Sequence, residues 1–196
     1  MYMFLLAQVW IKHKGMSRKY KFYNKEGLYF VSFATVYWID IFVRRLYCDI
    51  VVDSLIYCKK NLGLEIYCWC IMPSHIHLIF SAKNHNPDIL LGRIKEYTSK
   101  EIVKAIIENS QESRKEWLLW MFKRAGAKSS KVKGYQFWQH NNKPIELWST
   151  SVIEQKADYL HDNPVVGGFV NEAWHWKYSS AIDYSGGKGL IDLDEL

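Results

Sequence analysis

The hydrophobic pattern of this chain switches repeatedly between the alternation of a strand and the roughly 3.6-residue period of a helix. Residues 28–36 are rich in aromatic and β-branched side chains, as expected of a first strand. Residues 44–61 instead carry apolar side chains three and four positions apart, which predicts a helix. The complete expected series is strands at 28–36, 64–71, 75–81 and 145–148 and helices at 44–61, 89–107 and 152–162. This order predicts an α+β fold, a ferredoxin-like sandwich with a central antiparallel sheet and one further C-terminal helix.

Composition is typical of a globular protein with one domain. The chain has 196 residues, of which 49% are hydrophobic and 16% aromatic, enough to bury a substantial core. Its formal net charge of +6 suits a nucleic-acid partner without requiring one. The apolar start at 1–11 is too short to span a bilayer and lacks the features of a signal peptide. With four cysteines in apolar surroundings, we expect a cytoplasmic protein with reduced thiols and no membrane contact.

Two basic segments lie beside aromatic side chains, a combination that suits single-stranded DNA through phosphate pairing and base stacking. One precedes the first strand, and the other follows an amphipathic helix expected within residues 109–135. The candidate DNA-contacting cations are Arg18, Lys19, Lys21, Lys123, Arg124, Lys128, Lys131 and Lys133. The alternative for the second segment is a solvated basic loop beside a helix that turns its tryptophans inward.

The candidate chemistry begins with the tripeptide His75-Ile76-His77, inside an apolar, β-prone run. Because side chains two positions apart on a strand share a face, both imidazoles project to one side while Ile76 points to the other. Two converging neutral imidazoles form half of a site for a divalent metal. The alternative is a histidine pair on a half-exposed strand, with no ligand.

A second candidate segment holds Tyr159 and Asn163. The hydroxyl residues at 149–151 can cap the start of a helix that we expect to run over 152–162 and to end before Pro164. Tyr159 and Asn163 are four positions apart, so they share a helix face, with Asn163 at the frayed end. A phenol and an amide oxygen can then approach one metal. The alternative is a tyrosine that packs on the sheet.

Two further residues compete for roles in this chemistry. Tyr97, in the helix at 89–107, is a rival nucleophile, although its spacing groups it with core-facing side chains. His161 lies two positions after Tyr159, so a regular helix turns it about 200° away from the tyrosine face. We therefore do not assign His161 as a metal ligand.

Together the two candidate segments resemble those of a known family. The strand at 69–80 has the pattern Trp-x-x-Met-Pro-x-His-x-His, and the helix end at 158–170 has the pattern Tyr-x-His-x-Asn-Pro-Val. Both are similar to segments of the single-tyrosine HUH transposases, that is, the IS200-like group and most closely the REP-associated tyrosine transposases. The resemblance extends from about Ser17 to about Tyr184.

The resemblance implies a role for each matched residue. His75 and His77 fall on the histidines that bind a divalent metal, Tyr159 falls on the nucleophile, and Asn163 falls on the position of a third metal ligand in related enzymes. Such enzymes cut and rejoin single-stranded DNA at hairpin-flanked sites through a 5′-phosphotyrosine intermediate. Two imidazoles and one amide leave coordination positions open, which suits Mg²⁺ or Mn²⁺ rather than a closed zinc site.

The sequence therefore predicts a transposase, a metal-dependent DNA strand transferase and endonuclease whose partner is single-stranded DNA with hairpin structure. The alternative is a non-catalytic protein of the same fold that binds DNA or RNA hairpins. Both a monomer and a homodimer are compatible with the resemblance. By the same resemblance, the chain divides into a non-core extension at 1–15, an HUH transposase domain at 16–184 and a flexible tail at 185–196.

Overall fold

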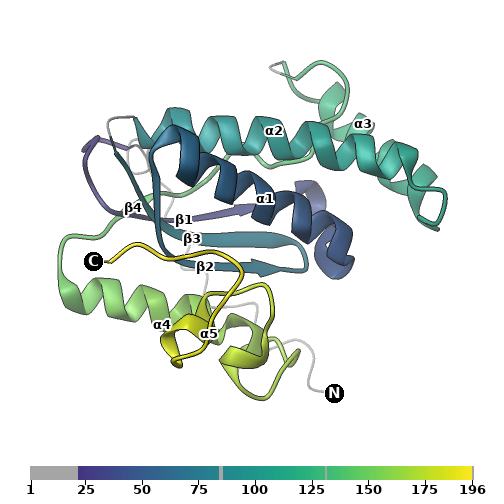
Figure 1. The fold of residues 1–196 in the computed structure, drawn as a ribbon. Coiled ribbons are helices and arrows are strands. Elements are labelled where there is room, and N and C mark those ends of the chain that lie inside the picture. Colours follow the sequence, from purple (N-terminus) through teal and green to yellow (C-terminus); the bar gives the residue numbers. More distant parts are fainter. Residues whose placement is uncertain (1–21, 84–85, 131, 196) are drawn as a thin grey trace, which may run out of the picture.

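The computed structural model describes residues 22–83, 86–130 and 132–195. Within them, a four-stranded antiparallel sheet has the spatial order β2-β3-β1-β4 (Figure 1). The strands are β1 (Tyr29–Ala34), β2 (Leu64–Met72), β3 (His75–Ala82) and β4 (Ile145–Glu146). The helices are α1 (Arg45–Leu62), α2 (Pro87–Glu108), α3 (Lys115–Ala127), α4 (Thr150–Val166) and α5 (Ala181–Tyr184), with short 3-10 helices η1 (Val36–Trp38), η2 (Ile41–Val43) and η3 (Ala173–His175). The order and the topology confirm the expected ferredoxin-like sandwich.

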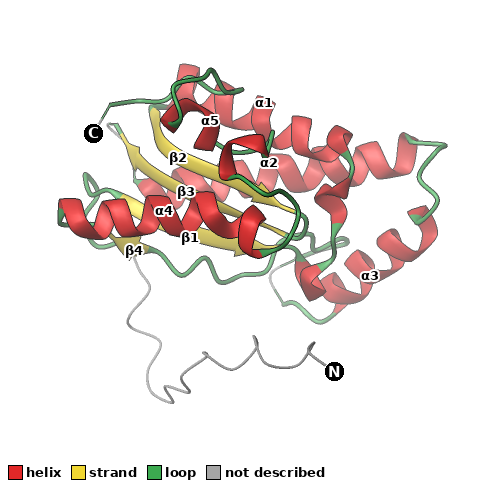
Figure 2. Cartoon of the chain, turned by 90° about the horizontal axis from the view of Figure 1, so that it is seen from below, coloured by secondary structure: helices red, strands yellow, loops and turns green. Residues whose placement is uncertain are grey.

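Helices cover both faces of the sheet. Helices α1 and α2 lie side by side on one face, whereas α4 crosses the other face, as Figures 1 and 2 show from two directions. Side chains along β3 alternate between these layers: Ile76 and Leu78 enter the core under α1 and α2, and Ile79 packs on the α4 side. The histidines of β3 occupy the α4 side as well, because they are spaced by two from Ile79.

The chain enters β2 through a tight turn after α1. Gly63 ends that helix with a φ of +70°, a conformation that side chains other than glycine's rarely adopt. A Cβ atom on Gly63 would also lie 2.5 Å from the carbonyl oxygen of Lys83. Both constraints fix glycine here and set the start of β2 next to the end of β3.

Helix α4 is longer than the sequence predicts, because it continues through Pro164 to Val166. A proline within a helix removes one N–H donor and disfavours the helical conformation of the residue before it. Here Pro164 is buried, and the backbone N–H groups of Gly167 and Phe169 donate to the carbonyls of Asn163 (2.8 Å) and Pro164 (2.9 Å). The expected end before Pro164 is therefore wrong, and Asn163 lies within the helix rather than at a frayed end.

Helix α3 is the amphipathic helix expected within 109–135. It buries Leu118 and Phe122 but leaves Trp117 and Trp120 exposed, at 45% and 54%. The alternative in which the tryptophans point inward is therefore wrong. Figure 2 shows α3 at the end of the molecule away from β4.

The C-terminal residues cover the free edge of β2. The sequence predicts a flexible tail at 185–196, but in the structure Ile191 is 2% exposed within the core. The backbone N–H of Asp194 donates to the carbonyl of Ile66 (2.8 Å), and the N–H of Ile66 donates to the Asp194 carboxylate (2.7 Å). These bonds satisfy backbone groups that an open edge strand would expose.

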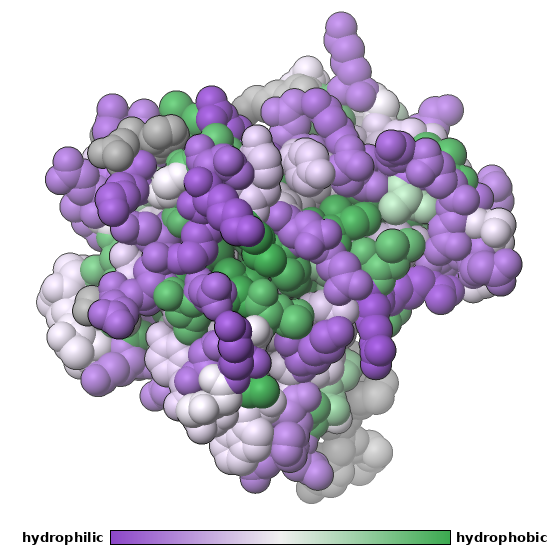
Figure 3. Space-filling model, viewed as in Figure 1, coloured by the Kyte–Doolittle hydropathy of each residue, from purple (hydrophilic) through white to green (hydrophobic). Residues whose placement is uncertain are grey.

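Some of the sequence predictions lie outside the described residues, namely the extension at 1–15 and the candidate contacts Arg18, Lys19, Lys21 and Lys131. Among the helices that the structure describes, none has the length and apolarity needed to cross a membrane. The face seen in Figure 3 is largely hydrophilic, with apolar residues gathered near its middle.

Candidate active site

His75 and His77 lie at the start of β3 on the face that α4 covers. Their ring centroids are 4.8 Å apart, and the rings are almost perpendicular, at 87°. On the neighbouring β1, the residues opposite them are Ala34 and Ser32. Because directly opposed residues of an antiparallel pair share a face, these small side chains do not crowd the imidazoles.

The turn before β3 orients His75. The carbonyl of Ser74 accepts hydrogen bonds from the backbone N–H (3.0 Å) and the hydroxyl (3.1 Å) of Thr35, which tie the turn to the end of β1. The Ser74 hydroxyl lies 3.2 Å from Nδ1 of His75. Burial lowers the pKa of His75 to about 4. The ring is therefore neutral at physiological pH.

His77 is the most constrained ionisable group of the site. It is only 3% exposed, and neither ring nitrogen has a hydrogen-bond partner among the described residues. Its pKa is lowered to about 3, mainly by burial and to a smaller extent by the charges of His75 and Lys156, while the Asn163 side chain acts in the opposite direction. A buried imidazole with both nitrogens unpaired is costly, and part of that cost is relieved when a metal binds the lone pair of the unprotonated nitrogen.

Helix α4 brings the candidate nucleophile to the histidines. The Tyr159 ring lies 5.5 Å from that of His77, measured between centroids, and the Tyr159 side chain is 51% exposed. One turn later, the amide of Asn163 donates to the Tyr159 carbonyl at 2.5 Å. Ser149 caps the start of this helix by accepting from the N–H of Val152 (3.4 Å). The structure thus brings together all four residues that the sequence singles out.

Two residues that sequence reasoning missed complete the surroundings of the phenol. Phe30 of β1 stacks on His77 with centroids 5.6 Å apart and rings inclined by 21°. The ammonium of Lys156 lies 5.3 Å from the Phe30 ring centroid and 5.5 Å from that of Tyr159. The ion pairs among the described residues do not include Lys156. Lys156 could have been found from the sequence, because it lies three residues before Tyr159 and therefore on the same side of a helix. Phe30 could not, because only strand pairing brings it to the site.

The competing residues lie elsewhere. Tyr97 is 53% exposed on α2, across the sheet from α4, so its expected position among core-facing side chains is wrong. His161 is buried, and its Nε2 forms a hydrogen bond with the hydroxyl of Ser180 at 2.8 Å. Burial lowers the pKa of His161 to about 4. Its Nε2 is already engaged by Ser180, in agreement with its turn away from the tyrosine face.

The remaining candidate cations gather at α3. Lys123 and Arg124 are exposed on that helix, and Lys128 and Lys133 are exposed after it. The guanidinium of Arg124 lies 5.2 Å from the Trp120 ring centroid. Cations and exposed aromatic rings are therefore combined on one surface, as single-strand binding requires.

The donor set at the histidines is distinct from a structural metal centre. Among the described residues, no group of three or more histidine, cysteine, aspartate and glutamate side chains could hold a metal ion. The ligands on offer are thus two imidazoles and the Asn163 amide, with open positions for oxygen atoms of a substrate or water. Such mixed nitrogen and oxygen sites suit Mn²⁺, and Mg²⁺ if enough oxygen ligands are added.

An antiparallel sheet with helices on both faces and these residues under α4 defines a class of protein, and comparison with known proteins identifies it. The model of a family described as "Transposase IS200 like" matches residues 33–141, more than half of the chain. The chain therefore belongs to the IS200-like transposase family and is a transposase. The matched region includes His75 and His77 and ends before Tyr159 and Asn163.

A solved structure shows the same fold. The chain is similar to the structure of a REP-associated tyrosine transposase bound to a REP hairpin, with a TM-score of 0.62 and 18% identity over 92% of this chain and 93% of that chain. A candidate transposase from Deinococcus radiodurans gives a TM-score of 0.43 and 19% identity over 77% of this chain and 97% of that one. No curated protein matches the sequence.

Proposed function

We propose that this transposase cuts and rejoins single-stranded DNA with Tyr159 as the nucleophile. The phenol oxygen attacks the scissile phosphorus and forms a 5′-phosphotyrosine bond, the bond from phosphorus to the 3′ oxygen breaks, and the leaving oxygen takes up a proton to become a free 3′-OH. The phenol proton passes to solvent, to which the half-exposed side chain is open. The reverse attack by a 3′-OH rejoins the strand, so the phosphodiester energy is conserved.

The observation that carries the proposal is the convergence of Tyr159 on His77, whose imidazole is buried with both nitrogens unpaired. In this proposal His75, His77 and Asn163 would hold Mg²⁺ or Mn²⁺. A bound divalent cation withdraws charge from the phosphate and orients it for in-line attack. Both histidines are neutral at physiological pH because burial lowers their pKa values, so they can serve as ligands without first losing a proton.

Lys156 has a separate role in the proposal. Its ammonium lies 5.5 Å from the centroid of the Tyr159 ring. It also offers a positive charge to a phosphate that approaches the tyrosine. We therefore propose that Lys156 positions the phosphate and supports the charge that develops during attack.

The proposed substrate is single-stranded DNA beside a hairpin. The structural relative with the same fold is bound to a REP hairpin, and the exposed cations and tryptophans of α3 suit DNA in this chain. The tyrosine helix and both histidines come from one chain, so the proposed site does not need a second copy to be complete.

The test is covalent attachment to DNA. Single-stranded oligonucleotides that carry the hairpins flanking this gene are incubated with protein and Mn²⁺ or Mg²⁺ and separated on a denaturing gel. We expect a protein–DNA adduct that disappears with Tyr159→Phe and with EDTA. Tyr97→Phe is the matched control, because it removes a similarly exposed phenol from the opposite face of the sheet.

Each outcome discriminates between functions. An adduct that survives Tyr159→Phe assigns the nucleophile elsewhere. Tight binding of the hairpin without an adduct favours the non-catalytic hairpin-binding protein.

A further inference from the structure

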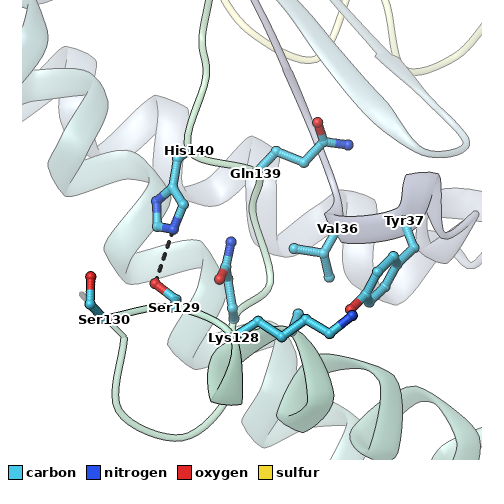
Figure 4. Close-up of a pocket in the computed structure, with 9 residues that line it drawn as sticks. Val36, Tyr37, Lys128, Ser129, Ser130, Gln139 and His140 are labelled. Carbon is cyan, nitrogen blue, oxygen red and sulfur yellow. Dashed lines mark hydrogen bonds between the residues drawn. The ribbon is translucent and has the colours of Figure 1, made fainter.

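A pocket of about 500 Å³ opens between η1, the C-terminal end of α3 and the segment at 136–140. This volume is within the range of small-ligand sites, about 300–1,000 Å³. Figure 4 shows Tyr37, Lys128, Ser129 and His140 around it. Nothing in the proposed strand cleavage uses these side chains.

The backbone beside this pocket is strained. Tyr37 and the next residue, Trp38, both have a φ of 56°, in the left-handed region that bulky side chains rarely adopt. The hydroxyl of Thr35 donates to the carbonyl of Ile39 at 2.8 Å and closes the turn around them. Such strain persists only where the surrounding structure enforces it, and it is concentrated at functional sites.

The strained pair connects the pocket to the active site. The Trp38 ring lies 5.4 Å from the ring of His75, measured between centroids, while the adjacent Tyr37 lines the pocket. Trp38 and Tyr37 are 56% and 44% exposed. A DNA strand with a phosphate at the histidines would therefore pass the exposed rings of Trp38 and Tyr37 on its way to the pocket.

The pocket has the chemistry of a nucleotide site. The Tyr37 ring offers a stacking surface, and the ammonium of Lys128 lies 6.0 Å from its centroid. On the opposite wall, Nε2 of His140 lies 3.2 Å from the hydroxyl of Ser129. No carboxylate is among the described residues that line the pocket. A flat base and an anionic phosphate match this combination of ring, cation and hydrogen-bonding groups.

The surface of α3 extends this chemistry away from the pocket. Trp117, Trp120, Arg124 and Lys128 follow each other at helical spacing, which at about 100° per residue places them within about 80° of one another around the axis. The stripe thus has two aromatic rings, on which bases can stack, followed by two cations that can pair with phosphates.

We infer that this pocket binds an unpaired nucleotide of the DNA strand that enters the active site, with its base against Tyr37 and its phosphate against Lys128. The strand then follows the α3 stripe past Trp120. This inference rests on the proposed function, because it assigns the path of that same substrate.

Binding of a fluorescein-labelled oligothymidylate in EDTA, followed by anisotropy, tests the pocket without the metal. The pocket variant combines Tyr37→Asn, which keeps a residue that tolerates positive φ, with Lys128→Gln. The control variant combines Tyr57→Leu with Lys60→Gln on the exposed surface of α1, and so removes the same ring and charge elsewhere. We expect binding about tenfold weaker for the pocket variant, since stacking contributes about 1–3 kcal/mol per base, and near wild-type binding for the control and for Tyr37→Phe.

Photo-crosslinking locates the base directly. An oligothymidylate that contains 4-thiothymidine should crosslink to the peptide with Tyr37 or to the α3 peptide. Equal binding by the pocket and control variants, no binding by the wild type, or crosslinks confined to other peptides would overturn the inference.

The adduct assay separates this inference from the proposed function. If the wild type forms the Tyr159 adduct and the pocket variant binds and reacts like it, only the pocket assignment fails. If the pocket variant loses oligothymidylate binding but no adduct forms with any hairpin, the pocket stands and the proposed strand transfer fails.

Discussion

Replacing His77 by leucine should make the metal-free protein more stable, although His77 is buried and lies at the centre of the proposed site. Neither of its ring nitrogens has a hydrogen-bond partner among the described residues. An unsatisfied buried polar group costs about 1–3 kcal/mol, and leucine removes that cost with a side chain of similar size. For a chain of this length, the gain corresponds to an increase in Tm of roughly 2–4 °C per kcal/mol.

The advantage of the leucine variant should grow as the pH falls. His77 has a pKa of about 3 in the folded state against 6.5 for a free histidine. Between pH 6.5 and about pH 3, His77 is therefore protonated in the unfolded chain but neutral in the folded chain. Wild-type stability therefore falls as the pH decreases from about 6.5 toward about 3. At about pH 5, roughly 1.5 units below the unfolded pKa, this difference is about 2 kcal/mol at 1.36 kcal/mol per unit.

Urea unfolding followed by tryptophan fluorescence in EDTA at pH 7 and pH 5 measures both effects. His161→Leu is the matched control: it removes another buried histidine, but one that is bonded to Ser180, so it should cost about 1 kcal/mol at pH 7. Mn²⁺ at tenfold its Kd should stabilise the wild type by about 1.4 kcal/mol and His77→Leu not at all. A His77→Leu protein that is no more stable than the wild type in EDTA at either pH would refute the reasoning.

Substitutions at four other positions test the packing and the role of Lys156. Gly126→Ala should destabilise the protein by about 3 kcal/mol, because the new Cβ would lie 1.9 Å from a facing carbonyl oxygen. Gly92→Ala should instead stabilise it by about 0.5–1 kcal/mol, because the new Cβ meets open space in α2. Thermal unfolding of the two variants measures both changes. Ile191→Ala should cost about 2–5 kcal/mol in urea unfolding, and no loss would show that the C-terminal segment does not pack as described. Lys156→Gln should slow adduct formation by about tenfold or more while Lys156→Arg retains most of the rate, and equal rates for both would exclude a role for the charge.

Relations between residues close in sequence could be predicted from the sequence. His75 and His77 share a face because a strand has a period of two, and Tyr159 and Asn163 share a face because four residues make about one helical turn. The strand and helix order also predicted the topology of the sheet, since few arrangements of such elements bury all their apolar faces.

Local rules were misleading where packing decided the outcome. Proline predicts the end of a helix, yet α4 continues because Pro164 is buried and the following N–H groups find carbonyl partners. Tyr97 has the spacing of a core residue. However, the face of α2 that packs against the core does not extend to Tyr97, so its ring is exposed to solvent. The tail is polar and rich in glycine, yet one apolar residue and one carboxylate dock it on the edge of β2.

The sequence by itself determined the two pairs of residues and the elements that carry them. That the two pairs meet was expected only from the family resemblance. Only the tertiary structure decided that Phe30 and Lys156 surround the phenol, and that strained aromatic residues lead from His75 to a pocket at the end of α3. The physical reason is the distance along the chain over which each effect acts. Backbone geometry fixes which residues share a face when they are a few positions apart. Contacts between distant segments depend instead on how all the apolar faces are buried together.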